Sequence, residues 1–243
     1  MTAKRFSATV GSSEVVGVLH LPDQTPSPCV IACHGMGASK DSDKYLLLAR
    51  VFPEAGLALA RFDFRGSGES GGLYRDATVA SRIADIEAVL DTLAKEPELD
   101  GRFGLLGSSL GGFVALWVAA AHRPALPVVT WNAPVSLIGL AESDPADPYG
   151  PGPALVAEIK QRARAEAPAG VSHVLVIQGD QDDIVPPAHG RFLYERGGEP
   201  RTLLIIRGAD HRLTDPLHRL EAVEQSRGWF ARHLAPRRLT PAG

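Results

Sequence analysis

Short, mostly apolar runs recur along the chain and alternate with amphipathic segments. Such runs are typical of strands buried on both faces, as in a parallel sheet. The runs are Cys29–Cys33, Leu57–Phe62, Phe103–Leu106, Pro127–Thr130, Val171–Ile177 and Thr202–Ile206. Ahead of them, Lys4–Val10 and Glu14–Leu21 are separated by a short Gly-Ser-Ser turn. This pair predicts an antiparallel hairpin at a sheet edge.

The segments between the runs carry a helical pattern. Apolar residues recur three or four positions apart at Val79, Ile83, Ile86, Leu90 and Leu93, which makes one apolar helix face. We expect further helices near 46–51, ending before Pro53, at 110–121, and at 216–234 behind the N-cap pair Asp215-Pro216. Strands alternating with helices indicate right-handed crossovers and an α/β fold with a mostly parallel, doubly wound sheet.

One stretch interrupts this alternation. Residues 135–170 contain the turn-rich segment ESDPADPYGPGP, followed by a helix-like segment at Ala154–Glu166. The sequence therefore predicts a single domain over residues 1–243, with a small cap inserted at 135–170.

Composition narrows the class of protein. The formal net charge is only −3, which gives no electrostatic reason to expect nucleic acid or an acidic membrane surface as a partner. Cys29 and Cys33 would be about 13 Å apart on one strand, beyond the ~7 Å that a disulfide spans, so both are predicted core thiols. The first residues lack the apolar core of a secretory signal, and no apolar stretch reaches the ~18 residues of a membrane span. We expect a cytoplasmic protein.

The pattern G-x-S-x-G occurs twice, at Gly107–Gly111 and at Gly68–Gly72. The pattern indicates a nucleophilic serine only where a strand turns sharply into a helix, because that turn exposes the serine hydroxyl. Ser109 has this context, since it lies between a buried-strand run and a helix-compatible run. Ser70 lies in a Gly-rich loop with no helix opening at it. Ser109 is therefore the candidate nucleophile.

A serine hydroxyl requires a base, and the base requires an orienting acid. In this architecture both are expected just past the carboxyl ends of later strands. His211 follows the run at 202–206, and Asp180, Asp182 and Asp183 follow the run at 171–177. The order Ser, Asp, His is the one expected for a hydrolase of this architecture.

The chain resembles the α/β-hydrolase superfamily, closest to its small bacterial esterase and serine-aminopeptidase-like members. The matching pieces are CHGMG, RFDFRGSGES, GSSLGG, GDQDDIVP and GADH, which together span most of the chain. By position, the resemblance places the acid at Asp182 and the oxyanion donors at the N–H groups of Met36 and Leu110. It also implies that the segment from Asp63 to Ser70 is chiefly structural.

The resemblance implies acyl transfer through Ser109, His211 and Asp182, with no metal or organic cofactor. We expect a serine hydrolase acting on small to medium carboxylic esters. A thioesterase or acyltransferase would use the same triad, and a non-catalytic ligand-binding homologue is a third reading. A peptidase is less favoured, because no acidic motif would anchor a substrate amino group. The expected partner is a small ester or thioester; monomer and homodimer both stay open.

Other residues receive structural interpretations. His34 is expected to shape its loop, and Ser108 to be the variable residue of the elbow. Trp131 is expected in the core, although it, Met36, Phe113 and Tyr149 could instead line an acyl pocket. His189 is expected to be a solvated helix start.

Overall fold

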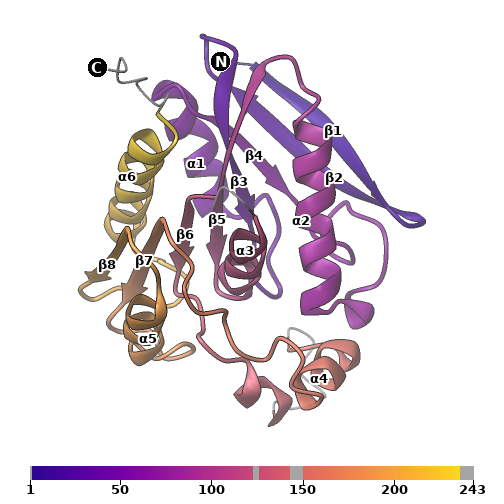
Figure 1. The fold of residues 1–243 in the computed structure, drawn as a ribbon, viewed down its shortest axis with the longest axis vertical. Coiled ribbons are helices and arrows are strands. Elements are labelled where there is room, and N and C mark those ends of the chain that lie inside the picture. The colour runs from indigo at the N-terminus through magenta and orange to yellow at the C-terminus, as the bar shows by residue number, and fades with distance from the viewer. Residues whose placement is uncertain (1, 123–125, 143–149, 236–243) are drawn as a thin grey trace, which may run out of the picture.

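The computed structural model describes residues 2–122, 126–142 and 150–235. Within these residues, eight strands form one sheet in the order β1-β2-β4-β3-β5-β6-β7-β8 (Figure 1). Their bounds are β1 Thr2–Val10, β2 Ser13–Leu21, β3 Ser27–Cys33, β4 Ala58–Phe62, β5 Leu99–Ser108, β6 Val128–Trp131, β7 Val174–Gly179 and β8 Arg201–Ile206. β1 pairs antiparallel with β2, and β2 pairs antiparallel with β4. From β4 through β3 to β8, each pair of neighbouring strands is parallel. The predicted edge hairpin and mostly parallel sheet are confirmed.

Helices cover both faces of the sheet. The α-helices are α1 Asp43–Glu54, α2 Val79–Leu93, α3 Leu110–Ala121, α4 Pro153–Lys160, α5 Ala188–Arg196 and α6 Pro216–His233, with short 3₁₀ turns η1 at Tyr74–Asp76 and η2 at Ile138–Glu142. One core joins α2 and α3 to the sheet, and a second core joins α1 and α6 to its opposite face (Figure 1). Successive strand side chains point to opposite faces, and both faces are covered, which explains why the central strands are largely apolar.

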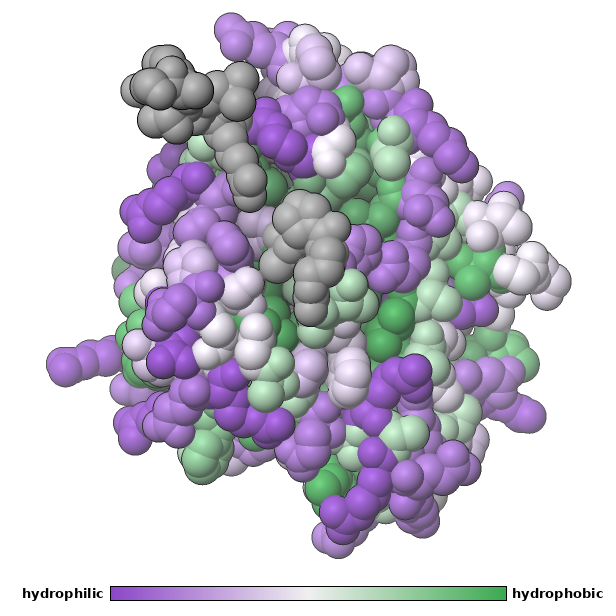
Figure 2. Space-filling model, in the orientation of Figure 1, coloured by the Kyte–Doolittle hydropathy of each residue, from purple (hydrophilic) through white to green (hydrophobic). Residues whose placement is uncertain are grey.

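β3 shows this arrangement. Cys29, Ile31 and Cys33 belong to the core with α2 and α3, whereas Val30 and Ala32 belong to the core with α1 and α6. Both cysteines are free and buried, as predicted. Figure 2 shows hydrophobic residues in small separate patches among hydrophilic ones on the face in view. No helix of the described residues is long and apolar enough to cross a bilayer.

Helix ends follow the capping residues. Thr78 and Ser81 form a reciprocal capping box at the start of α2, and the Asp215 side chain accepts the N–H of Leu217 at the start of α6. The predicted end of the first helix before Pro53 is wrong, because α1 runs through Pro53 to Glu54. A proline in the last helical turn removes only one hydrogen bond, and burial of Phe52 and Pro53 compensates for it.

Several other bounds differ from the predictions, and two of the differences follow from backbone reversals. β7 begins at Val174 rather than Val171, because His173 has a left-handed backbone with φ 56° that no strand contains. The helix predicted at Ala154–Glu166 ends at Lys160, and Arg162 and Arg164 again have positive φ. Apolar periodicity does not report such backbone reversals.

The segment 135–170 places α4 beyond the carboxyl ends of the central strands (Figure 1). Its described residues include η2 and α4, and Leu155 and Ile159 of α4 are buried in the core with α2 and α3. Ser136 and Glu166 form an isolated antiparallel bridge that closes the base of the segment. Tyr149, one of the predicted pocket residues, lies outside the described residues.

Candidate active site

Ser109 occupies a strained turn between β5 and α3. Its backbone has φ 54° and ψ −127°, a conformation that non-glycine residues rarely adopt. The flanking glycines permit this turn: a Cβ on Gly107 would lie 2.4 Å from the Gly111 carbonyl oxygen, and one on Gly111 would lie 2.2 Å from that of Cys33. The turn therefore lifts the Ser109 hydroxyl off the sheet, as the G-x-S-x-G spacing predicts.

The structure brings Ser109, His211 and Asp182 into one hydrogen-bonded chain. The Ser109 hydroxyl lies 3.1 Å from His211 Nε2, where it donates to the ring, and His211 Nδ1 lies 2.8 Å from Asp182 Oδ2. This geometry holds the imidazole with its proton on Nδ1 and its lone pair toward the serine, which is the tautomer that a general base requires.

The Asp182 carboxylate is buried and accepts several hydrogen bonds from the protein. Oδ1 accepts the backbone N–H groups of Ile184 at 3.0 Å and Val185 at 2.7 Å, and the Gln178 side chain donates to Oδ2 at 3.3 Å. The neighbouring acids point elsewhere: Asp180 accepts the N–H of Gly208, and Asp183 is exposed. Among these three carboxylates, only that of Asp182 reaches the imidazole.

Asn132 anchors the loop that carries His211, and the sequence analysis missed it. Its side-chain amide donates to the carbonyl oxygens of Asp210 at 3.1 Å and His211 at 2.9 Å, and its oxygen accepts the N–H of Gly179. Asn132 also has positive φ, at 51°. The available signal was an asparagine directly after an apolar strand, at the edge of the sheet where functional groups gather.

The N–H groups of Met36 and Leu110 were the predicted oxyanion donors. Neither N–H donates a hydrogen bond to another residue in the described part of the chain. Leu110 begins α3, where backbone N–H groups lack partners inside the helix. A Cβ on Gly35 would lie 3.1 Å from the Ser109 Cβ, so the loop with Met36 packs closely against the serine. Free donors on both sides of Ser109 can receive a developing negative charge.

His34 fixes this loop, in agreement with its predicted structural role. Its Nε2 accepts the Phe64 N–H at 3.0 Å, and its Nδ1–H donates to the Gly35 carbonyl oxygen at 2.8 Å. Burial lowers its pKa to about 4, and the positive charge of Arg82 adds to this effect. The ring is therefore neutral at pH 7 and serves as a spacer rather than a base.

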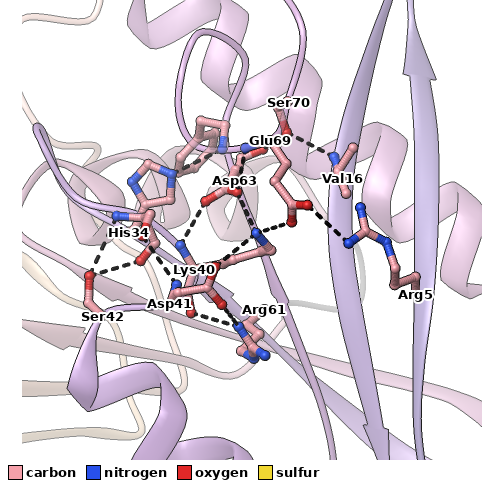
Figure 3. Close-up of polar contacts among 12 residues, drawn as sticks. Arg5, Val16, His34, Lys40, Asp41, Ser42, Arg61, Asp63, Glu69 and Ser70 are labelled. Atoms are coloured by element: carbon pink, nitrogen blue, oxygen red, sulfur yellow. Dashed lines mark hydrogen bonds and ion pairs between the residues drawn. The ribbon is translucent and has the colours of Figure 1, made fainter.

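A cluster of charges around the buried Lys40 ammonium lies beside the same loop (Figure 3). The Lys40 ammonium is 2% exposed and contacts Asp63 at 2.8 Å, Asp41 at 3.0 Å and Glu69 at 2.5 Å. The Lys40 backbone N–H also donates to Asp63 at 2.7 Å. The Ser70 hydroxyl donates to the Asp63 carbonyl oxygen and accepts the Val16 N–H. The serine of the second G-x-S-x-G pattern therefore has a structural role in this loop.

Other polar groups near the elbow have structural partners. Lys44 donates to the Ser108 hydroxyl at 2.7 Å, and burial, together with Arg219 and Arg212, lowers the pKa of Lys44 to about 8. Trp131 is fully buried and donates to Ser226, so it belongs to the core as predicted. His189 begins α5 but is only half solvated, because its Nδ1 accepts the Val135 N–H at 3.0 Å. The described residues contain no group of three or more His, Cys, Asp or Glu side chains suited to a metal ion.

The chain is similar to a known protein family and to several known proteins. A family model described as the prolyl oligopeptidase family matches residues 44–237. An uncharacterised protein of Mycobacterium tuberculosis is 30% identical over 190 residues, which cover 76% of this chain but only 63% of that relative. A monoacylglycerol lipase of Mycolicibacterium smegmatis is 24% identical over 274 residues, covering 93% of this chain and 96% of the lipase.

Among solved structures, Est1E from Butyrivibrio proteoclasticus with ferulic acid bound superposes with a TM-score of 0.84. The two chains are 20% identical, and the match covers 95% of this chain and 100% of Est1E. At this identity the likeness shows a shared fold.

Proposed function

The chain belongs to the prolyl oligopeptidase family and has the α/β-hydrolase fold, and from this premise we propose that it is a serine hydrolase of carboxylic esters. The observation that carries the proposal is the hydrogen-bonded chain from Ser109 through His211 to Asp182, set on a strained elbow. Strain of this kind persists where the surrounding fold enforces it, and it is common at reacting groups.

In the first step, Ser109 Oγ attacks the ester carbonyl carbon while His211 Nε2 takes the hydroxyl proton. The Asp182 carboxylate stabilises the imidazolium that forms, and it keeps its own negative charge. The carbonyl oxygen becomes an oxyanion and accepts hydrogen bonds from the N–H groups of Met36 and Leu110. His211 then returns the proton to the departing alcohol, which leaves an acyl group on Ser109.

In the second step, water replaces the alcohol. His211 Nε2 takes a proton from the water, the hydroxide attacks the acyl carbon, and Ser109 leaves with the proton restored. Each oxyanion donor contributes roughly 3–4 kcal/mol to lowering the barrier in enzymes of this mechanism. Both steps use the same base and the same oxyanion site, so a single arrangement of side chains serves the whole cycle.

The substrate class proposed is a small to medium acyl ester. A monoacylglycerol lipase among the relatives supports ester chemistry, while the family description supports amide cleavage as the competing reaction. We favour esters, because the sequence offers no acidic motif for a peptide amino group. Thioester hydrolysis or acyl transfer on the same residues remains a distinct outcome of the test.

The test is a series of 4-nitrophenyl esters from acetate to octanoate, matched acyl thioesters and peptide 4-nitroanilides, with kcat/KM measured for each. Ester turnover that disappears in Ser109→Ala supports the proposal. A fluorophosphonate probe should label wild type and Ser70→Ala at Ser109, as read by peptide mass spectrometry. Absence of both turnover and labelling in folded protein overturns the enzymatic assignment in favour of a binding protein.

A further inference from the structure

Arg82 is a buried cation that the proposed mechanism does not use. It lies in the first turn of α2 and is 2% exposed, one of the largest fully enclosed side chains of the protein. Its guanidinium stacks over the Phe64 ring, 4.7 Å from the ring centroid. Burial lowers the pKa of Arg82, which reflects the energetic penalty of enclosing this charge.

The Arg82 guanidinium lacks the partners that a buried cation requires. Its Nε–H and Nη1–H groups donate to no described residue, and no carboxylate of the described chain lies within ion-pair distance. The nearby Asp85 is already engaged, since Arg65 donates to it from both its backbone N–H and its side chain. Unsatisfied buried charges are rare in folded proteins and call for an explanation.

Two other buried cations of the described residues contact carboxylates. Lys40 contacts three carboxylates, and the largely buried Arg61 pairs with Asp41. The buried Lys44 ammonium instead donates to the Ser108 hydroxyl. Arg82 differs from all three, because its Nε–H and Nη1–H groups reach neither a carboxylate nor a hydroxyl of the described residues, and an anion from outside the chain would satisfy both donors.

Arg82 of α2 packs near the carboxyl ends of β3 and β4. Phe64, which Arg82 stacks on, follows the carboxyl end of β4, and Cys33 is the last residue of β3. Burial raises the pKa of the Cys33 thiol, and the nearby Arg82 charge opposes this rise. The Phe64 ring meets the His34 ring edge-on, with centroids 5.0 Å apart, and His34 leads into the loop with Met36. Through these contacts Arg82 is two side chains from the proposed oxyanion site.

The sheet order separates Arg82 from the base. β4 and β3 lie on one side of the Ser109 strand β5, whereas β7 and β8, which carry Asp182 and His211, lie on the other. The departing alcohol must face His211 to receive its proton. The acyl part of a bound ester is thus directed toward the side of the sheet where Arg82 is enclosed.

We propose that Arg82 is an anion-binding, specificity-determining residue of this site, and that the substrate is an ester whose acyl chain carries a carboxylate. The carboxylate accepts hydrogen bonds from the free donor groups of the guanidinium. This inference rests on the proposed ester hydrolysis at Ser109, but the binding it describes is measurable without turnover.

Binding is tested with glutarate and the inactive variant Ser109→Ala by titration calorimetry. Glutarate is expected to bind this variant, to bind equally well when Arg75→Met is added, and to lose binding when Arg82→Met is added. Arg75 is the matched control, since it lies on the neighbouring η1 turn and is exposed. Binding that survives Arg82→Met, or no binding to Ser109→Ala, overturns the proposal whether or not the enzyme hydrolyses esters.

Turnover supplies a second measurement. Wild type is expected to prefer mono-4-nitrophenyl glutarate over 4-nitrophenyl butyrate by roughly 10- to 100-fold in kcat/KM, the range of one charge-assisted contact. Arg82→Met should collapse this ratio toward one, and Arg82→Lys should retain part of it. If Arg82→Met does not fold, the wild-type ratio decides, and equal rates on the two esters reject the carboxylate assignment.

Discussion

Replacing Asp182 with Asn tests the geometry most directly, because it changes a hydrogen-bond direction and almost no volume. In the native structure Oδ1 accepts two backbone N–H groups, from Ile184 and Val185, and His211 Nδ1 lies 2.8 Å from Oδ2 and 3.0 Å from Oδ1. The amide oxygen of Asn must take the Oδ1 position to satisfy those two donors. Its NH₂ group then faces His211 Nδ1.

An NH₂ group at that position requires Nδ1 to accept, which moves the imidazole proton to Nε2. Nε2–H cannot take a proton from Ser109, so the base is lost although every atom stays near its place. We expect kcat to fall roughly 10³- to 10⁴-fold, which corresponds to about 4–5.5 kcal/mol in the activation barrier. KM for a short 4-nitrophenyl ester should change little.

The assay is steady-state hydrolysis of that ester, with urea unfolding to show that the variant is folded. Asp183→Asn is the matched control, since it removes a carboxylate from the adjacent, exposed position and should keep kcat within about twofold. If Asp182→Asn retains more than a tenth of the wild-type kcat, or Asp183→Asn is equally damaging, the tautomer argument is refuted.

Three further outcomes concern stability. Lys40→Met leaves the buried carboxylate of Asp63 without its cation and should lower the free energy of unfolding in urea by about 3–5 kcal/mol. Gly111→Ala drives a methyl group to 2.2 Å from a backbone carbonyl oxygen and should lower the free energy of unfolding by about 3 kcal/mol or more. Gly228 lies inside α6 and faces open space, so Gly228→Ala should raise the free energy of unfolding by about 0.5–1 kcal/mol. The pKa of His34 is about 4 in the folded protein against an ordinary 6.5, so the unfolded chain takes up the proton first as pH falls. The free energy of unfolding should therefore drop by about 2 kcal/mol from pH 7 to pH 5 through His34. His34→Gln should remove that part of the pH dependence.

Each of these has an outcome that would contradict it. The surface control for Lys40 is Arg5→Met, which breaks an exposed ion pair and should stay within about 0.5 kcal/mol of wild type; equal losses would discredit the buried-charge argument. A Gly111→Ala protein as stable as Gly228→Ala would mean that the elbow relaxes freely. Identical pH slopes for wild type and His34→Gln would show that other groups govern the acid response.

Local patterns in the sequence were sufficient for the architecture. The run Cys29–Cys33 is apolar at every position, and the structure buries its alternate side chains in two different cores. The spacing of Val79, Ile86 and Leu93 gave the buried face of α2. These signals work because periodic burial is a property of a few consecutive residues. Gly107 and Gly111 also marked the elbow in advance, since a Cβ at these positions would lie only 2.4 and 2.2 Å from carbonyl oxygens.

Patterns failed where a distant contact outweighed a local preference. α1 continues through Pro53 because that residue is buried, and the Ala154–Glu166 pattern breaks after Lys160 where the backbone reverses. The anchoring role of Asn132 depends on two loops that are far from it along the chain. No window of sequence contains such partners.

The sequence by itself determined which elements form, which serine lies at a strand-to-helix turn and which residue types could accompany it. Only the tertiary structure brings Ser109 and His211, 102 positions apart, within 3.1 Å of each other. It also sets Asp182, the acid that the resemblance placed there, against the imidazole and turns Asp180 to Gly208. It alone showed that Arg82 is enclosed with two of its donor groups unpartnered. The physical reason is that hydrophobic periodicity acts between neighbours along the chain, whereas the meeting of side chains depends on the order of strands in the sheet and on the loops that leave their ends.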